Sequence, residues 1–149
     1  MRNNSWIALT LGMIVVFSSL CFAGLPSSAI GLGGVTPGDS VEVAKYKFGV
    51  PNVRGDKFYF SNGVVVEIDS KQPDVIEEIK TKNSKVNTPA GVTVGMSEYV
   101  LNDHYGAADK VENDSDGDVE YKYFSVDGQK KMTFKVHNGV IQKIKCEKC

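Results

Sequence analysis

The feature of this sequence that most constrains its fold is an internal repeat. Residues 34–49 and 91–106 are related by a constant offset of 57, and seven of the sixteen aligned positions are identical. The positions that define the repeated motif are Gly34, Thr36, Gly38, Ser40 and Gly49 in the first copy, and Gly91, Thr93, Gly95, Ser97 and Gly106 in the second. We infer a tandem duplication, which predicts two similar modules in one chain.

Each copy is predicted to begin with a turn and a short helix. Ser40 and Ser97 follow the turn, where a serine hydroxyl can accept a hydrogen bond from a free backbone N–H at the start of a helix. Apolar residues four positions apart then predict one helix face that covers a sheet. These residues are Ala44 and Phe48 in the first copy, and Leu101 and Tyr105 in the second. A glycine closes each helix, because glycine adopts the left-handed conformation at least cost.

Strands follow the helix in each copy. Asn62-Gly63 and Asn138-Gly139 each lie between two β-rich runs, and an Asn-Gly pair in that position is a strong hairpin signal. The runs are 57–60 and 64–68 in the first copy, and 131–136 and 140–144 in the second. The second copy holds 19 additional residues, which predict a further strand over 119–126. Residues 75–80 predict a third strand in the first copy, with a short helix as the alternative.

These elements predict an α+β fold of two tandem modules, each a short helical element followed by an antiparallel sheet of about three strands. The predicted boundaries are a signal peptide over 1–23, a lead-in over 24–33, module one over 34–82, a polar linker over 83–90, module two over 91–145, and a Cys-x-x-Cys tail over 146–149.

The N-terminus predicts export to the cell envelope, periplasmic or at the cell surface, or to the extracellular space. Arg2 precedes the uncharged run 6–22, and Ala23 is the small residue expected at a signal-peptide cleavage site. The alternative is retention of this segment as a membrane anchor, which is the one membrane contact we expect. Lipid attachment at Cys21 is disfavoured, because Leu20 stands where a lipoprotein signal needs glycine, alanine or serine.

The charge balance excludes one class of partner. The chain carries 17 basic and 18 acidic residues, a formal net charge of −1. Proteins that bind nucleic acid as a main task present a clearly basic surface. We therefore expect no nucleic-acid partner.

The repeated pattern resembles a known family. A Gly-Val-Thr-x-Gly-x-Ser turn, a helix ending in Phe-Gly or Tyr-Gly, and a β-meander with Asn-Gly turns behind a signal peptide are similar to the BLIP-like and BamE-like (SmpA/OmlA) small exported proteins. The resemblance covers residues 34–68 and 91–145. It implies a non-catalytic protein of the envelope or extracellular space that binds a protein partner. The chain departs from the BamE pattern in lacking a lipoprotein signal and in carrying two modules.

Aromatic residues in the strands are the candidate protein-binding residues. Phe58 and Phe60 share one strand face, and Tyr121 and Tyr123 share another, because side chains alternate along a strand. An exposed aromatic face would favour protein binding, since aromatic anchors dominate interface energies. The alternative is that the rings form the core beneath the helices.

Two other kinds of site are weaker candidates. Residues 112–120 concentrate carboxylates around Gly117, and Asp114, Asp116 and Asp118 are the candidate metal ligands, although a calcium-binding EF-hand loop would need Glu where Tyr123 stands. Cys146 and Cys149 are a candidate disulfide, with free thiols, a metal site or a redox role as alternatives. The alternative function is therefore that of a small exported protein that binds a metal or another ligand through residues 112–120 or through these cysteines.

We assign no catalytic residue and no cofactor. Residues 38–41 read Gly-Asp-Ser-Val, similar to the nucleophile block of one hydrolase class, but the sequence has no Asp-x-x-His to activate Ser40. The second copy keeps the serine and replaces the aspartate with Met96, which a helix cap explains better than a nucleophile does.

Overall fold

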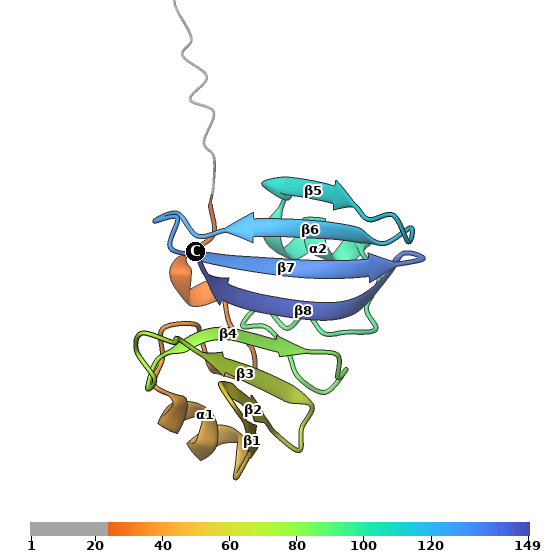
Figure 1. Ribbon diagram of the computed structural model, residues 1–149. Coiled ribbons are helices and arrows are strands. Elements are labelled where there is room, and N and C mark those ends of the chain that lie inside the picture. Colours follow the sequence, from red (N-terminus) through yellow and green to blue (C-terminus); the bar gives the residue numbers. More distant parts are fainter. Residues whose placement is uncertain (1–23) are drawn as a thin grey trace, which may run out of the picture.

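The computed structural model describes residues 24–149 and shows an α+β fold, with two helices and one eight-stranded antiparallel sheet (Figure 1). In chain order the elements are the 3-10 turn η1 (Ser27–Ala29), α1 (Val41–Phe48), β1 (Asn52–Arg54), β2 (Lys57–Tyr59), β3 (Val64–Ile68), β4 (Ile76–Thr81), α2 (Tyr99–Tyr105), β5 (Lys110–Asn113), β6 (Val119–Phe124), β7 (Lys130–His137) and β8 (Val140–Lys148). The predicted signal peptide, residues 1–23, lies outside the described residues. Within residues 24–149, no helix has the length and apolar character needed to cross a membrane.

The sheet joins both halves of the chain. Its strand order is β1-β2-β3-β4-β8-β7-β6-β5, so that the last strand of each half pairs with the last strand of the other. The prediction of a separate sheet for each module is therefore wrong. Pairing β4 with β8 places buried Ile79 opposite buried Cys146 and covers two strand edges that would otherwise remain open.

Each half contains four strands after its helix, one more than the sequence predicted. The missed strands are β1 and β5, the two outermost strands of the sheet. Neither has the alternation of buried and exposed residues that identifies a strand in a sequence, because almost all of their residues are exposed. The strand predicted over 75–80 is confirmed as β4, and the helix alternative is wrong.

Both Asn-Gly hairpins are confirmed, but they lie at different places in their halves. Asn62-Gly63 joins β2 to β3, whereas Asn138-Gly139 joins β7 to β8. In the second hairpin both turn residues have positive φ, 48° and 76°, as a two-residue turn of type I′ requires. Position by position, the first hairpin therefore corresponds to the second and third strands of its half, and the second hairpin to the third and fourth.

The repeated glycine-serine motif fastens each helix to the last strand of its own half. The Gly38 N–H donates to the carbonyl of Ile76 at the start of β4, and the Gly95 N–H donates to the carbonyl of Ile141 near the start of β8, both at 2.8 Å. The serine that follows caps the helix as expected, because the Glu42 N–H donates to Ser40 Oγ at 3.2 Å. The equivalent Ser97 Oγ accepts from the N–H of residue 99 at 3.3 Å.

The helix ends also agree between the halves. Gly49 and Gly106 follow α1 and α2 with φ of 91° and 75°, and each N–H donates to the carbonyl four residues earlier. This backbone conformation is strained for any residue with a Cβ, which explains why both copies have glycine here.

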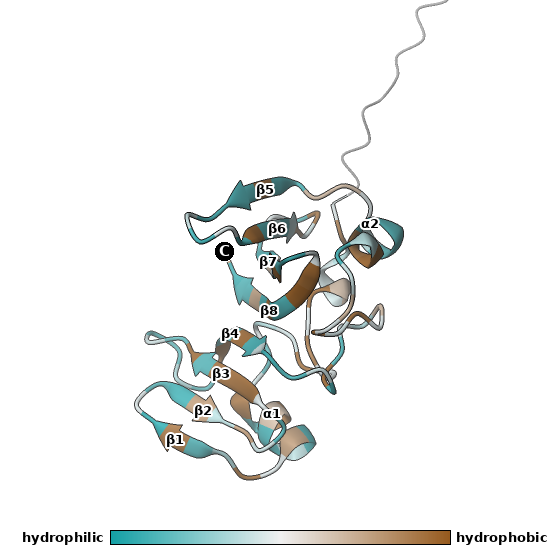
Figure 2. Cartoon of the chain, turned by 90° about the vertical axis from the view of Figure 1, so that its right-hand side faces the viewer, coloured by the Kyte–Doolittle hydropathy of each residue, from teal (hydrophilic) through white to brown (hydrophobic). Residues whose placement is uncertain are grey.

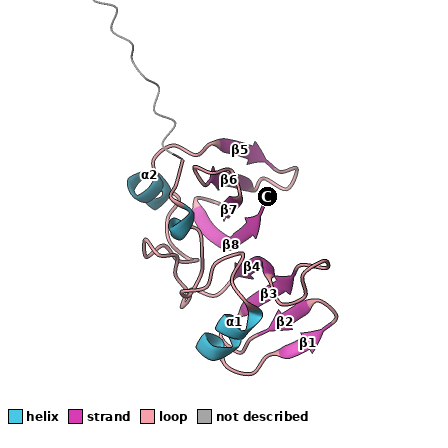
Figure 3. Ribbon diagram, turned by 90° about the vertical axis from the view of Figure 1, so that its left-hand side faces the viewer, coloured by secondary structure: helices cyan, strands magenta, loops and turns pink. Residues whose placement is uncertain are grey.

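Both helices lie on one side of the sheet, and the core lies between them and the strands (Figures 2 and 3). Ala44 from α1 and Leu101 from α2 are buried there, as their spacing predicted. The predicted lead-in is also part of this core, because Ile30 and Leu32 are fully buried. Two residues of the predicted polar linker, Val86 and Thr88, are buried as well. Thr88 Oγ1 lies 2.6 Å from the hydroxyl of Tyr105, a buried residue of α2.

Candidate functional site

Most of the aromatic residues proposed for protein binding lie in the core. Phe58, Phe60 and Tyr123 are all buried on the side of the sheet that the helices cover. The Phe60 ring packs edge-on against Phe48 at 5.4 Å between ring centroids, and Tyr123 packs against Tyr105 at 5.3 Å. Phe58 and Phe60 do lie on the same side of the sheet, as predicted. However, these three rings form part of the core beneath the helices, which was the alternative to an exposed binding surface.

Tyr121 is the member of this set that remains partly exposed. It stands in β6 in a row of side chains that cross the sheet in register, from Ile144 in β8 through Phe134 in β7 to Val111 in β5. Ile144 and Phe134 are fully buried, whereas Val111 is 52% exposed. The apolar row of the core thus continues to the edge of the sheet and ends there in contact with solvent.

A groove of about 250 Å³ opens where this row reaches the edge. Helix α2 forms one wall with Glu98 and Tyr99, and the edge strands form the other with Val111 and Tyr121. Tyr99 is 78% exposed, so a large aromatic side chain stands free beside the groove. We call this site, defined by Glu98, Tyr99, Val111 and Tyr121, the α2–β5 groove.

A hydrogen bond links the two walls of the groove. The Tyr121 hydroxyl donates to Glu98 Oε2 at 2.8 Å, which raises the pKa of Tyr121 and ties β6 to the start of α2. Deeper in the site, the buried Tyr123 hydroxyl donates to the carbonyl of Gly106 at 3.1 Å. Burial raises the pKa of Tyr123 to about 12, so this phenol stays neutral at physiological pH. The walls therefore combine fixed polar groups with exposed apolar surface.

Strand β5 forms one edge of the sheet, because it pairs with β6 alone. An edge strand presents unpaired backbone N–H and C=O groups to which an extended segment can add. The α2–β5 groove lies beside this edge, so it could receive a side chain of such a segment.

Sequence reasoning missed Tyr99 and Val111. Val111 lies in a strand that the sequence did not predict. A signal for Tyr99 was present in the repeat, since at the offset of 57 it corresponds to Glu42, an ordinary exposed residue of a first helical turn. A tyrosine at that solvent-facing position distinguishes the second half from the first.

Two of the acidic residues proposed as metal ligands, Asp114 and Asp118, form ion pairs with Lys135. Glu112 and Glu120 belong to β5 and β6, so the loop itself is 114–118. Asp118 Oδ2 lies 3.1 Å from Lys135 Nζ and Asp118 Oδ1 lies 2.6 Å from His137 Nδ1, and these partners lower the pKa of Asp118. In the described part of the chain, no three histidine, cysteine or acidic side chains are grouped to hold a metal ion.

The disulfide prediction is wrong, and so is the prediction of a C-terminal tail. Strand β8 continues to Lys148, which places fully buried Cys146 in the core while Cys149 is exposed. Residues three apart on a strand point to opposite faces of the sheet, which keeps the two thiols apart. Burial raises the pKa of the Cys146 thiol above its usual range, so it behaves as an apolar core residue.

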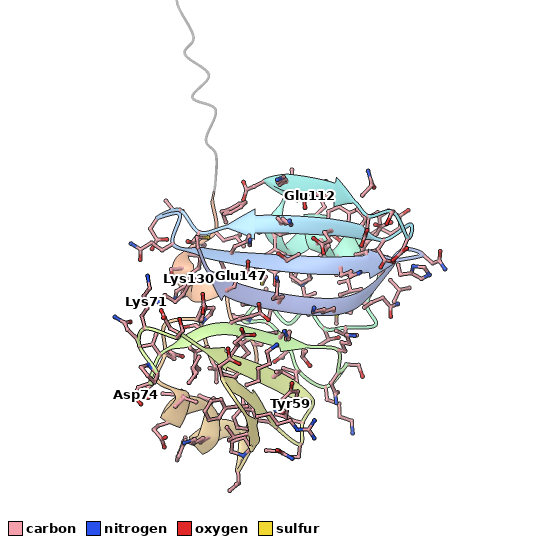
Figure 4. All side chains as sticks on the ribbon, in the orientation of Figure 1. Tyr59, Lys71, Asp74, Glu112, Lys130 and Glu147 are labelled. Atoms are coloured by element: carbon pink, nitrogen blue, oxygen red, sulfur yellow. The ribbon has the colours of Figure 1, made fainter. Side chains whose placement is uncertain are left out.

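The face of the sheet that the helices leave uncovered carries ion pairs between lysine and glutamate residues of neighbouring strands. Near the end of β8, Glu147, labelled in Figure 4, forms ion pairs with Lys131 and Lys145, each at 2.7 Å. In the neighbouring strand, Lys80 pairs with Glu78 at 2.6 Å. We call this surface the open face of the sheet.

The ion pairs of the open face continue to the edge strand β5. Lys110 and Lys122 both contact Glu112, which Figure 4 labels at the upper edge. Their hydrogen bonds hold the pKa of Glu112 at about 2. The carboxylates of this edge therefore have cationic partners within the fold.

Comparison with known proteins identifies the fold. No protein-family model and no curated protein matches the chain. The solved structure of YjgB from Bacillus subtilis, a DUF4309 family protein, is similar with a TM-score of 0.51 and 17% identity, over 85% of this chain and 88% of that one. A cysteine-rich secretory protein from Staphylococcus aureus is similar with a TM-score of 0.54 and 13% identity, over 84% of this chain and 47% of that one.

The chain shares the fold of YjgB. It spans about half the length of the staphylococcal protein. These similarities overturn the resemblance to BLIP-like and BamE-like proteins, because the matching structures belong to other groups and contain this fold over most of the present chain. At such low identity the similarity extends to the fold alone.

Proposed function

We propose that the protein is exported and binds a protein partner in the α2–β5 groove, without catalysing a reaction. The observation that carries the proposal is the apolar row that runs from fully buried Ile144 to half-exposed Val111 and ends in this groove. A core that reaches solvent at an open sheet edge leaves apolar surface that a partner can cover.

The partner that fits this site is an extended segment with an apolar side chain. Such a segment would add to the free edge of β5 through backbone hydrogen bonds, which supply affinity but little selectivity. One of its side chains would enter the groove between Tyr99 and Tyr121. Tyrosine is well suited to the walls of such a site, because it provides a large contact area with few rotatable bonds.

Export is supported by two independent observations. The N-terminal sequence predicts a signal peptide over residues 1–23, and the staphylococcal protein with a similar fold is described as secretory. A secreted fraction is therefore the appropriate source in which to look for the partner.

We also propose that the two halves arose by tandem duplication. Both have a helix followed by four strands, and in both the glycine-serine motif bonds to the beginning of the last strand. The exposed Tyr99 is then a feature that one copy has and the other lacks.

The test compares two double variants, each of which changes one exposed tyrosine in the helix and one exposed valine in the outermost strand of one half. Tyr99→Ala with Val111→Lys alters the groove, whereas Tyr46→Ala with Val53→Lys alters the opposite end of the sheet, where Tyr46 is 90% and Val53 52% exposed. Partners are captured from culture fluid and envelope extract by cross-linking, and the affinity for each captured protein is then measured. We expect the groove variant to lose at least about tenfold in affinity, because truncating a tyrosine at the centre of an interface costs about 2 kcal/mol or more, and about 1.4 kcal/mol corresponds to tenfold.

The proposal fails if the folded wild-type protein captures no saturable partner. It also fails if both double variants bind as well as the wild type, or if the control variant loses affinity as much as the groove variant does. Circular dichroism and thermal unfolding of each variant establish that it is folded before binding is compared.

A further inference from the structure

Four lysines, Lys80, Lys82, Lys143 and Lys145, lie close together on the open face where the two halves of the sheet meet. Strands β4 and β8 pair in a register that places Lys80 opposite Lys145. Lys82 directly follows β4, two residues after Lys80, and Lys143 lies in β8 two residues before Lys145, so both continue the row of lysines on this face. Like charges directly opposite each other on neighbouring strands are destabilising, so this arrangement needs a compensating charge.

Only two of these four lysines form ion pairs with carboxylates of the described chain. Lys80 pairs with Glu78 at 2.6 Å, and Lys145 pairs with Glu147 at 2.7 Å. For Lys82 and Lys143, residues 24–149 supply no carboxylate within ion-pair distance. Lys143 is partly buried, and its burial together with Lys80, Lys145 and Lys82 lowers its pKa.

Two cavities meet at these lysines. The smaller, of about 270 Å³, is bordered by three lysine side chains and by no acidic side chain of the described chain; its lining residues are Gly63, Val65, Lys80, Thr81, Lys82 and Lys143. The larger, of about 550 Å³, shares Lys82 and Lys143 with the first. It extends to the 114–118 loop, where it is also lined by Asp116 and by Asp118, and Asp118 is paired with Lys135 and hydrogen-bonded to His137.

From this geometry we infer that Lys82 and Lys143 bind a phosphate group at the junction of β4 and β8. Two uncompensated ammonium groups match the charge of a phosphate dianion, and lysine binds phosphate as a point charge without a fixed geometry. The phosphate lies in the smaller cavity, and the larger cavity accommodates whatever the phosphate is attached to. The site is separate from the α2–β5 groove, which lies on the side of the sheet that the helices cover.

The test uses titrations of the purified protein at constant ionic strength. Inorganic phosphate, glycerol 3-phosphate and acetate are added separately, and binding is followed by calorimetry and by the NMR signals of the lysine ammonium groups. We expect saturable binding of a phosphate compound and a higher pKa for Lys143 in the complex. Tighter binding of glycerol 3-phosphate than of inorganic phosphate identifies an organic phosphate as the ligand, and the reverse order identifies free phosphate.

Two double variants separate this site from general electrostatic attraction. Lys82→Gln with Lys143→Gln should weaken phosphate binding at least tenfold. Lys71→Gln with Lys85→Gln removes the same charge from exposed positions elsewhere and should leave the affinity within twofold of the wild type. In the absence of phosphate, the first variant should unfold at a temperature no lower than the wild type, because it relieves a repulsion.

Three results would overturn the inference: no saturable binding of either phosphate compound to the folded wild type, equal binding of acetate, or equal loss of affinity in the two double variants. None of these outcomes bears on the protein-binding proposal, since the variants leave Tyr99 and Val111 unchanged.

Discussion

Replacing Cys146 with serine tests whether the C-terminal cysteines are separate, as the structure shows. The Cys146 side chain is fully buried in β8, opposite buried Met132 on one neighbouring strand and buried Ile79 on the other. A serine hydroxyl at this position would be a polar group in an apolar site. Burying a poorly paired hydroxyl costs about 1–3 kcal/mol of unfolding free energy.

The measurement is urea unfolding of Cys146→Ser and of Cys149→Ser under the same conditions. We expect the first variant to lose about 1–3 kcal/mol and the second, at an exposed position, to remain within about 0.5 kcal/mol of the wild type. A thiol reagent should modify Cys149 in the native protein and reach Cys146 only after unfolding, because the thiolate is the reactive form and burial raises the pKa of Cys146.

A disulfide would produce a different pattern. The two serine variants would then lose similar amounts of stability, because either one breaks the same bond. In the native protein without reductant, neither thiol would react, and the intact mass would be lower by two hydrogen atoms. Either result would refute the placement of Cys146 as a core residue.

Three further predictions concern stability. Leu101→Ala should lower the unfolding free energy by about 2–5 kcal/mol in urea, because it leaves a cavity beneath α2. Gly106→Ala should cost about 1–3 kcal/mol in the same assay, from backbone strain alone, since nothing lies within 4 Å of the added Cβ. Asp118→Asn should lower the melting temperature at pH 7 but not at pH 2. Because the pKa of Asp118 is lower in the folded than in the unfolded protein, its ionised carboxylate stabilises the fold at pH values above the unfolded pKa. That stabilisation is lost as acid protonates the carboxylate.

The sequence by itself determined the local structure of this protein. The glycine-serine turns, the helix caps, the closing glycines and both Asn-Gly hairpins follow from conformational preferences of a few adjacent residues, and all were predicted correctly. The pairing of aromatic residues on common strand faces was also predictable, because alternation along a strand needs no knowledge of its neighbours.

Tertiary structure decided which of those faces is buried. Alternation assigns Phe58 and Tyr123 to a face, but only the position of the helices shows that this face is the core. The edge strands β1 and β5 also depend on tertiary structure, since nearly all of their residues are exposed and they form by pairing with β2 and β6. Val111 became part of the candidate site through that pairing.

The joining of the halves was likewise invisible in the sequence. Strands β4 and β8 are far apart along the chain, and their pairing depends on backbone hydrogen bonds that any two strands of suitable length can form. That pairing places Lys80 opposite Lys145, and buried Ile79 opposite buried Cys146. The lysine site therefore depends on contact between distant strands, whereas the α2–β5 groove is formed by α2 and the hairpin of β5 and β6, which follow one another in the chain. Local sequence preferences determine the elements, and their packing in the tertiary structure determines both sites.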